Sequence, residues 1–255
     1  MNKTSSHSLG ALGAIVAINL FAATGYGGSW SNEFSSPRAA SSSDIVKGDV
    51  KGGGLSLLLV VGDQPAAYSN ITNLLAQLPE VGALDTFDST GGTPTLDQLL
   101  NYSCVVVWAN FPHFDPDALG NNLADYVDLG GGVIASTPSR ISGFYYIGGR
   151  FLNDGYDPMF NGSGPQGPST LGDFVPDHPA MTMPYEISDL FGDLREMTSL
   201  RPDVEDVARW MDALPLLAVS GGVAGDTAFL HDGRWNGEFP QLLVNTCLYI
   251  TGAGS

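Results

Sequence analysis

The stretch of residues 126–140 reads YVDLGGGVIASTPSR and decides the fold of this chain. A helix pattern ends at Leu129, three glycines turn the chain, and the apolar run at residues 133–135 predicts a buried strand. That strand is expected to end at residues 136–139, which read STPS. In an open α/β sheet, the residues that follow the carboxyl end of a strand line the crevice where ligands bind. We therefore expect any chemistry of this domain at this turn.

The segments before this stretch alternate between strand and helix patterns. Residues 55–61 read LSLLLVV, a continuous apolar run that fits a strand buried on both faces of a parallel sheet. The alternation continues with a helix at 66–78, a strand at 83–87, a helix capped by Thr95, a strand at 104–109 and a helix capped by Asp115 or Asp117. This order predicts an α/β fold with a doubly wound, mostly parallel sheet and helices on both faces.

Beyond Arg140 the regular alternation stops. Residues 141–184 are rich in Gly, Pro, Asn, Asp and aromatic residues, and a loop of this length is usually functional or covers the sheet. The remaining pattern predicts a strand near 198–201, a helix near 204–211, strands at 214–219 and 227–231, and a closing helix at about 240–250.

The composition limits the classes of partner. The chain has 255 residues with 10 Lys+Arg against 27 Asp+Glu, a formal net charge of −17, and its hydrophobic fraction of 43% is enough for a packed core. A surface this acidic repels phosphate backbones, so we expect no nucleic-acid partner. No segment of the mature domain is apolar and long enough to predict a membrane span.

The N-terminal region predicts export. Residues 9–23 form an apolar run after Lys3, so residues 1–26 are expected to be a signal peptide or an N-terminal anchor. Residues 27–54 are rich in Ser and Gly and are expected to form a flexible linker before a domain at 55–252. The expected location is secreted, cell-surface or periplasmic. Cys104 and Cys247 are expected to be buried, and their spacing leaves open whether they pair.

Several motifs resemble the class I glutamine amidotransferase-like superfamily, over about residues 55–252. They are the opening strand with its early helix, the WANFP turn at 108–112, the YVDLGGGVI stretch at 126–134, the DHPAM turn at 177–181 and the closing WNGEFPQLLVNTCLYI at 235–250. The resemblance implies a flavodoxin-like, three-layer sandwich of the Rossmann-like kind. The closing segment is similar to that of secreted members that are mostly uncharacterised.

The resemblance also implies a place for catalysis. Active members of the superfamily carry a cysteine nucleophile directly after the strand that corresponds to residues 133–135, with a later histidine and a carboxylate. Here the turn reads STPSR and contains no cysteine. We therefore expect an exported pseudoenzyme, a non-catalytic domain that needs no cofactor and acts as a binding or assembly module for a small-molecule, carbohydrate or protein partner.

A serine hydrolase is the alternative. Ser136 or Ser139 would replace the thiol, with His231 as the base that a serine hydroxyl needs at neutral pH. The absence of a Gly-x-Ser-x-Gly motif argues against this hypothesis. The missing cysteine leaves the chain's status as an enzyme open, with the balance against catalysis.

Further polar residues are candidates for binding. Asp63 follows the first strand and His113, Asp115 and Asp117 follow the third, an arrangement that would suit a divalent cation unless these aspartates only end a strand and cap a helix. Aromatic faces and Asp or Asn side chains within residues 144–174 would suit a sugar, unless the aromatics only cover the sheet edge. The ligand-binding candidates are Asp63, Asn110, His113, Arg140, Arg150 and Tyr156.

Overall fold

The computed structural model describes residues 45–47, 54–141, 143 and 145–253. The predicted signal peptide or anchor at 1–26 and most of the predicted linker lie outside the described residues. Within these ranges, no helix combines the length and the apolar character needed to cross a bilayer.

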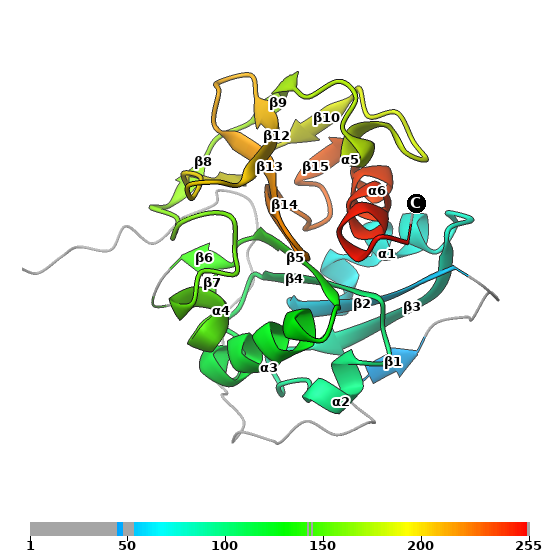
Figure 1. Ribbon diagram of the computed structural model, residues 1–255, viewed down its shortest axis with the longest axis vertical. Helices are drawn as coiled ribbons and strands as arrows, with labels where there is room; N and C mark the ends of the chain where they lie inside the picture. The colour runs from blue at the N-terminus through cyan, green and yellow to red at the C-terminus, as the bar shows by residue number, and fades with distance from the viewer. Residues whose placement is uncertain (1–44, 48–53, 142, 144, 254–255) are drawn as a thin grey trace, which may run out of the picture. The chain divides into compact units, whose positions relative to one another are not determined.

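Most of the described strands form one large mixed sheet (Figure 1). Its main path runs in the order β1-β3-β2-β4-β5-β14-β13-β12-β9-β10-β15, and β11 pairs with both β14 and β8 to bring the total to 13 strands. The first half of the chain contributes β1 (Ile45–Lys47), β2 (Leu55–Gly62), β3 (Val81–Asp88), β4 (Cys104–Ala109) and β5 (Gly132–Thr137). The second half contributes β8 (Pro165–Gln166), β9 (Ser169–Phe174), β10 (Leu190–Gly192), β11 (Arg195–Glu196), β12 (Glu205–Trp210), β13 (Pro215–Ser220), β14 (Val223–Phe229) and β15 (Trp235–Gly237). A separate hairpin pairs β6 (Arg140–Ile141) with β7 (Tyr145–Tyr146).

The predicted doubly wound, mostly parallel, flavodoxin-like and Rossmann-like sandwich is wrong. Parallel pairing is confined to β2 with β3, β2 with β4, β4 with β5, and β5 with β14. The other pairs of the sheet are antiparallel, so that most of the strands added after β5 form hairpins. The alternation of strand and helix that suggested the parallel sheet ends at β5, and the second half of the chain adds strands without crossover helices.

One misread segment explains much of this error. Residues 204–211 have helical apolar spacing, yet they form strand β12. Register shifts interrupt the pairing of β12 with β13 between Asp206 and Ala208 and again between Ala208 and Arg209. A bulge breaks the two-residue alternation of a strand, and the remaining spacing then resembles that of a helix.

Helices cover both faces of β2, β4 and β5 (Figure 1). On one face, α1 (Ser69–Leu75) and α6 (Phe239–Thr251) pack against Leu57, Leu59 and Val106. On the other face, α2 (Leu96–Leu99) and α3 (Pro116–Asp128) pack in a second core cluster that contains Leu58, Val60 and Val105. Two further short helices are α4 (Gly149–Asn153) and α5 (Pro179–Thr182).

A disulfide joins the parallel strands to the last helix. Cys104 in β4 and Cys247 in α6 are both fully buried and are bonded to each other, which answers the question that their spacing left open. The two cysteines are 143 positions apart in the sequence. The bond therefore fixes α6 to the face of the sheet.

The glycine turn in the YVDLGGGVI stretch directs the chain into β5. Gly130 has φ +95°, a left-handed conformation that favours glycine. At Gly131 a Cβ atom would lie 2.2 Å from the Tyr126 ring, so only glycine fits there. Tyr126 is buried and its hydroxyl donates to the carbonyl of Tyr102 at 2.9 Å. These contacts fix the point at which β5 begins.

Candidate functional site

The turn after β5 is buried. Strand β5 ends at Thr137, the Thr137–Pro138 peptide is cis, and β6 begins at Arg140. The side chains of Ser136, Ser139 and Arg140 lie among the buried polar groups of the protein. The position at which sequence analysis places the superfamily's nucleophile is therefore shielded from solvent.

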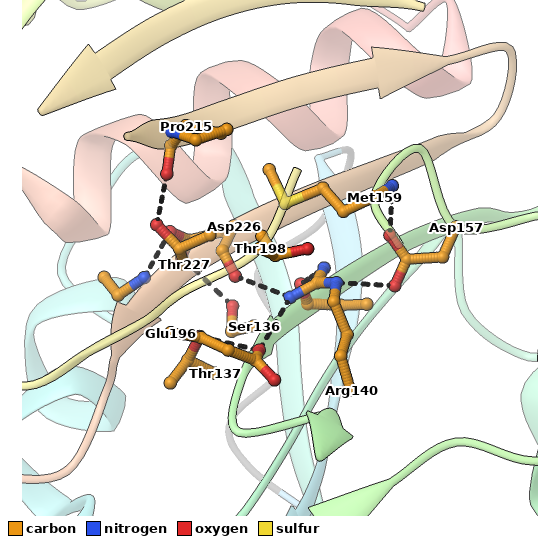
Figure 2. A network of polar contacts seen from close by, with 12 residues as sticks. Ser136, Thr137, Arg140, Asp157, Met159, Glu196, Thr198, Pro215, Asp226 and Thr227 are labelled. Carbon is orange, nitrogen blue, oxygen red and sulfur yellow. Dashed lines mark hydrogen bonds and ion pairs between the residues drawn. The ribbon is translucent and has the colours of Figure 1, made fainter. Parts of the chain in front are cut away.

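Arg140 is the centre of a buried polar network (Figure 2). Its Nε lies 2.8 Å from Asp157 Oδ2, and its Nη1 lies 3.3 Å from Glu196 Oε2. The guanidinium also donates to two carbonyl oxygens, that of Ala135 at 2.6 Å from Nη2 and that of Asp226 at 3.2 Å from Nη1. Arg140 thereby links β5 and β14 to β11 and to the loop that carries Asp157.

The network holds more carboxyl groups than cations. Asp226 accepts hydrogen bonds from Ser136 Oγ at 3.1 Å and from the backbone N–H of Ala228 at 2.8 Å. Burial raises the pKa of Asp226 to about 7, and it also raises the pKa of Asp157 and of Glu196. The guanidinium forms ion pairs with two of these three buried carboxyl groups, and the burial of Asp226 favours a bound proton on it near neutral pH.

Packing leaves little room beside these groups. A Cβ atom on Gly225 would lie 2.8 Å from Arg140 Nη2, and one on Gly162 would lie 2.4 Å from Glu196 Oε1. Ser139 Oγ is buried and, among the described residues, has no hydrogen-bond partner. Ser136 Oγ donates to a carboxyl group, so in the described part of the chain neither hydroxyl is hydrogen-bonded to a histidine.

The structure does bring three other predicted residues together, at the ends of β2 and β4 and in the loop that follows β14. His231 Nδ1 lies 2.8 Å from Asp63 Oδ2, and Asn110 Nδ2 lies 3.4 Å from Asp63 Oδ1. The backbone N–H groups of Asn110 and Phe111 both donate to the carbonyl of Gly62 at 2.7 Å. A Cβ atom on Gly62 would lie 2.6 Å from the carbonyl oxygen of Phe111, so glycine permits this close approach.

The other predicted metal-binding residues lie apart from this cluster. His113 is buried, and its Nδ1 is 2.8 Å from Ser89 Oγ, while burial lowers its pKa to about 4. Asp115 caps α3 by accepting from the N–H of Ala118, and Asp117 accepts from the N–H of Gly149. Within the described residues, no group of three or more His, Cys, Asp or Glu side chains is arranged to hold a metal ion.

Arg150 and Tyr156 meet at the surface, at the C-terminal end of α3. Arg150 forms ion pairs with Asp125, Asp128 and Asp154, and it donates to the Tyr156 hydroxyl at 2.9 Å. Its guanidinium carbon lies 5.7 Å from the centre of the Tyr156 ring. Hydrogen bonds from the Tyr156 hydroxyl and from Arg150 lower the pKa of Asp128.

An open depression of about 350 Å³ lies beside this cluster. It is formed where the end of α3, the loop after α4 and the turn between β13 and β14 meet. Its lining residues are Val127, Asp154, Gly155, Tyr156, Ser220, Gly221, Gly222 and Val223.

Sequence analysis missed Glu196 and Asp226. Asp226 is an acid in the otherwise uncharged strand VAGDTAF, all of whose residues are buried. A charged residue within such a strand is a usable sign of a buried polar partner, because an unpaired buried charge is costly. Glu196 lies in a two-residue strand, and the sequence holds no comparable sign for it.

No protein-family model matches this sequence, and no curated protein matches it. Similar solved structures include cytoplasmic protein STM3548 from Salmonella typhimurium, which is 14% identical over 77% of this chain and 99% of that chain, with a TM-score of 0.59. Cytoplasmic protein STM1381 from Salmonella typhimurium LT2 is 12% identical over 77% of this chain and 97% of that chain, with a TM-score of 0.54. At such identities the similarity shows the fold alone.

The similar structures give the predicted location no support. Both Salmonella proteins are named as cytoplasmic, in contrast to the secreted, cell-surface or periplasmic location predicted from residues 1–26, so that prediction is not kept. A glutamine amidotransferase structure is 14% identical over 76% of this chain and 98% of that chain, with a TM-score of 0.41. This is a weak structural similarity to a glutamine amidotransferase, and it does not show the expected superfamily.

Proposed function

We propose that this chain is a divergent class I glutamine amidotransferase-like domain without a nucleophile, and that it acts as a binding module for neutral carbohydrate. The observation that carries the proposal is the open depression of about 350 Å³ beside Tyr156, which contrasts with the buried turn after β5. The proposal concerns ligand binding, and it assigns no reaction to the turn.

The buried turn supports the part of the proposal that assigns no nucleophile to this turn. A serine nucleophile needs a base within hydrogen-bond reach and an approach path for the substrate. Ser136 Oγ instead donates to Asp226, and Ser139 Oγ is buried. Among the described residues, no hydrogen bond joins His231, which the hydrolase hypothesis requires as the base, to either serine.

The lining of the depression supports a hydroxyl-rich ligand. Tyr156 offers an aromatic surface and Asp154 a carboxylate, a combination that suits sugar rings and their hydroxyl groups. At Gly221 a Cβ atom would meet nothing within 4 Å, so the backbone there is open to close approach by a ligand. Tyr156 and Asp154 lie in the loop after α4 and Gly221 lies in the turn between β13 and β14, so two segments supply these groups.

The charge around the depression favours a neutral ligand. Arg150 is the cation of this cluster, and three carboxylates already surround it. Together with the net charge of −17, this arrangement repels phosphates and carboxylates. A neutral oligosaccharide avoids that repulsion.

A binding measurement tests this proposal. We expect saturation-transfer NMR and calorimetry to detect binding of a neutral oligosaccharide from a panel of gluco-, galacto- and manno-oligosaccharides, with Tyr156→Ala and Asp154→Asn each weakening it about tenfold or more. Tyr249→Ala is the matched control, because Tyr249 also donates its hydroxyl to a surface carboxylate, that of Glu205. Equal binding by Tyr156→Ala and the wild type, or no binding of any panel member, would contradict the proposal.

A further inference from the structure

The three histidines in the described residues differ in what their ring nitrogens contact. His178 has both nitrogens engaged, with Nε2 3.1 Å from Glu205 Oε2 and Nδ1 accepting from the N–H of Ala180. His113 is fully buried, and its Nε2 has no hydrogen-bond partner among the described residues. His231 is different, because a carboxylate holds its Nδ1 while 28% of its side chain is exposed.

The partner of His231 is well fixed. The Asp63 side chain is 1% exposed and lies 2.8 Å from His231 Nδ1. Its other oxygen accepts from the backbone N–H of Gln64 at 2.8 Å, with the Asn110 amide at 3.4 Å. A buried carboxylate on Nδ1 favours the tautomer with its proton on that nitrogen, which leaves Nε2 as the proton acceptor. The described residues supply no hydrogen-bond partner for Nε2.

The loop that carries His231 is held on both sides. The His231 ring stacks on Phe229 at a centroid distance of 5.3 Å. The next residue, Asp232, donates its N–H to the carbonyl of Ala67 and accepts from Ser69 Oγ and the N–H of Asn70 at the start of α1. These contacts hold the imidazole in place before any substrate arrives, as a catalytic base requires.

The pair also lies at the edge of the sheet where ligands bind in open α/β sheets. Asp63 directly follows β2, and His231 lies two residues beyond the end of β14. Both strands run parallel with β4 and β5, so their carboxyl ends share one edge. Asn110, directly after β4, adds an amide to the same edge.

We propose that Asp63 and His231 form a proton-transfer site that activates water for the hydrolysis of activated acyl esters. His231 is the catalytic residue, and Asp63 is a positioning residue that acts through it. This site is separate from the turn after β5 and requires no serine or cysteine nucleophile.

The proposed hydrolysis consumes only the ester and one water molecule. His231 Nε2 takes a proton from a water molecule while the water oxygen forms a bond to the acyl carbon. The bond from that carbon to the leaving oxygen then breaks, and the imidazolium returns its proton to the leaving alkoxide or to solvent. The products are a carboxylic acid and an alcohol.

The expected rate enhancement indicates which class of substrate the site can hydrolyse. General-base catalysis by a positioned side chain contributes about 10²–10⁴-fold. This range is too small for an amide, which reacts slowly with water, but it gives measurable turnover of an ester with a good leaving group. p-Nitrophenyl acetate is therefore the probe.

The test compares hydrolysis of p-nitrophenyl acetate by the full chain and its variants. We expect the wild type to exceed the rate in buffer, with a normal solvent deuterium isotope effect because a proton moves in the slow step. His231→Gln should remove this excess, whereas His178→Gln, the matched control with both ring nitrogens engaged, should keep it. A wild-type rate equal to that of buffer, or full activity of a folded His231→Gln variant, would overturn the proposal.

A second measurement tests the positioning role of Asp63. Asp63→Asn should lower the hydrolysis rate about tenfold or more, and nitrogen-15 NMR of the imidazole should show the His231 proton moving from Nδ1 to Nε2 because an amide can donate to Nδ1. Asp63→Glu should restore part of the rate. An unchanged tautomer in folded Asp63→Asn would overturn this role. The carbohydrate proposal is tested independently, because its readout is the binding of an oligosaccharide and involves no ester hydrolysis.

Discussion

The turn after β5 and the Asp63–His231 pair both lie at the carboxyl ends of parallel strands, yet they differ in access to solvent. At the turn, Arg140, Asp157 and Glu196 have side chains that are 8% exposed or less, and their polar atoms mainly contact one another. At the pair, a buried carboxylate holds a histidine with 28% of its side chain exposed. Position at the sheet edge therefore does not make a site by itself. A functional group must also keep one polar atom free for a ligand.

The largest expected effect on stability comes from removing the cation of the buried polar network around Arg140. Arg140→Met would leave Asp157 and Glu196 buried without their cation, so we expect the free energy of unfolding to fall by about 3–5 kcal/mol in urea denaturation. The matched control is Arg150→Met, since Arg150 is 40% exposed and should cost about 0–1 kcal/mol. Equal losses in the two variants would show that Arg140 is not the centre of a buried network.

The next effect is a pH dependence of stability. The pKa of Asp226 is raised by burial from 3.8 to about 7, so the folded state binds a proton that the unfolded state releases. Stability from this group is full below pH 3.8 and is lost as the pH rises through about 7, a change of up to about 4 kcal/mol at roughly 1.4 kcal/mol per unit. Urea denaturation at a series of pH values should show this decline, and Asp226→Asn should flatten it. A decline of the same size in the folded variant would assign the effect to other groups.

A smaller effect on stability is expected at the Asp63–His231 pair. His231→Gln removes one hydrogen bond from Asp63 but leaves the backbone bond from Gln64, so we expect a loss of about 1 kcal/mol in the free energy of unfolding. Thermal denaturation alongside Arg140→Met provides the check. A loss as large as that of Arg140→Met would mean that the histidine is chiefly structural.

The smallest effect is expected at Ser139. Its hydroxyl is buried, and the described residues offer it no hydrogen-bond partner. Removing an unsatisfied buried hydroxyl is neutral or stabilising, so Ser139→Ala should change the free energy of unfolding by less than about 1 kcal/mol, with any gain in favour of the variant. A serine-directed phosphonate probe should not label the wild type. Labelling that Ser139→Ala abolishes would instead support the serine hydrolase hypothesis.

The sequence predicts the first half of the fold better than the second. Strands at residues 55–61 and 104–109 are continuous apolar runs, and they correspond to β2 and β4. The closing helix expected at about 240–250 is α6. In the second half, bulges in β12 and very short strands such as β8 and β11 remove the periodicity on which such predictions depend.

The sequence predicted individual residues of the candidate site, but it did not predict which of their side chains contact each other. Asp63 and His231 were candidates because each follows a strand, but they are 168 positions apart and nothing local links them. Likewise, Arg140 was a candidate at the turn, while its partner Glu196 lies 56 positions away. Such pairings depend on the order of strands in the sheet, which the sequence pattern misjudged after β5.

The measurement that tests the contrast between the two regions most directly is one assay of ester hydrolysis on variants of both. p-Nitrophenyl acetate would be given to the wild type, to Ser136→Ala and Ser139→Ala at the closed turn, and to His231→Gln at the open pair. We predict that both serine variants keep the wild-type rate and that His231→Gln falls to the rate in buffer. Loss of activity in a folded serine variant, with His231→Gln still active, would contradict this account.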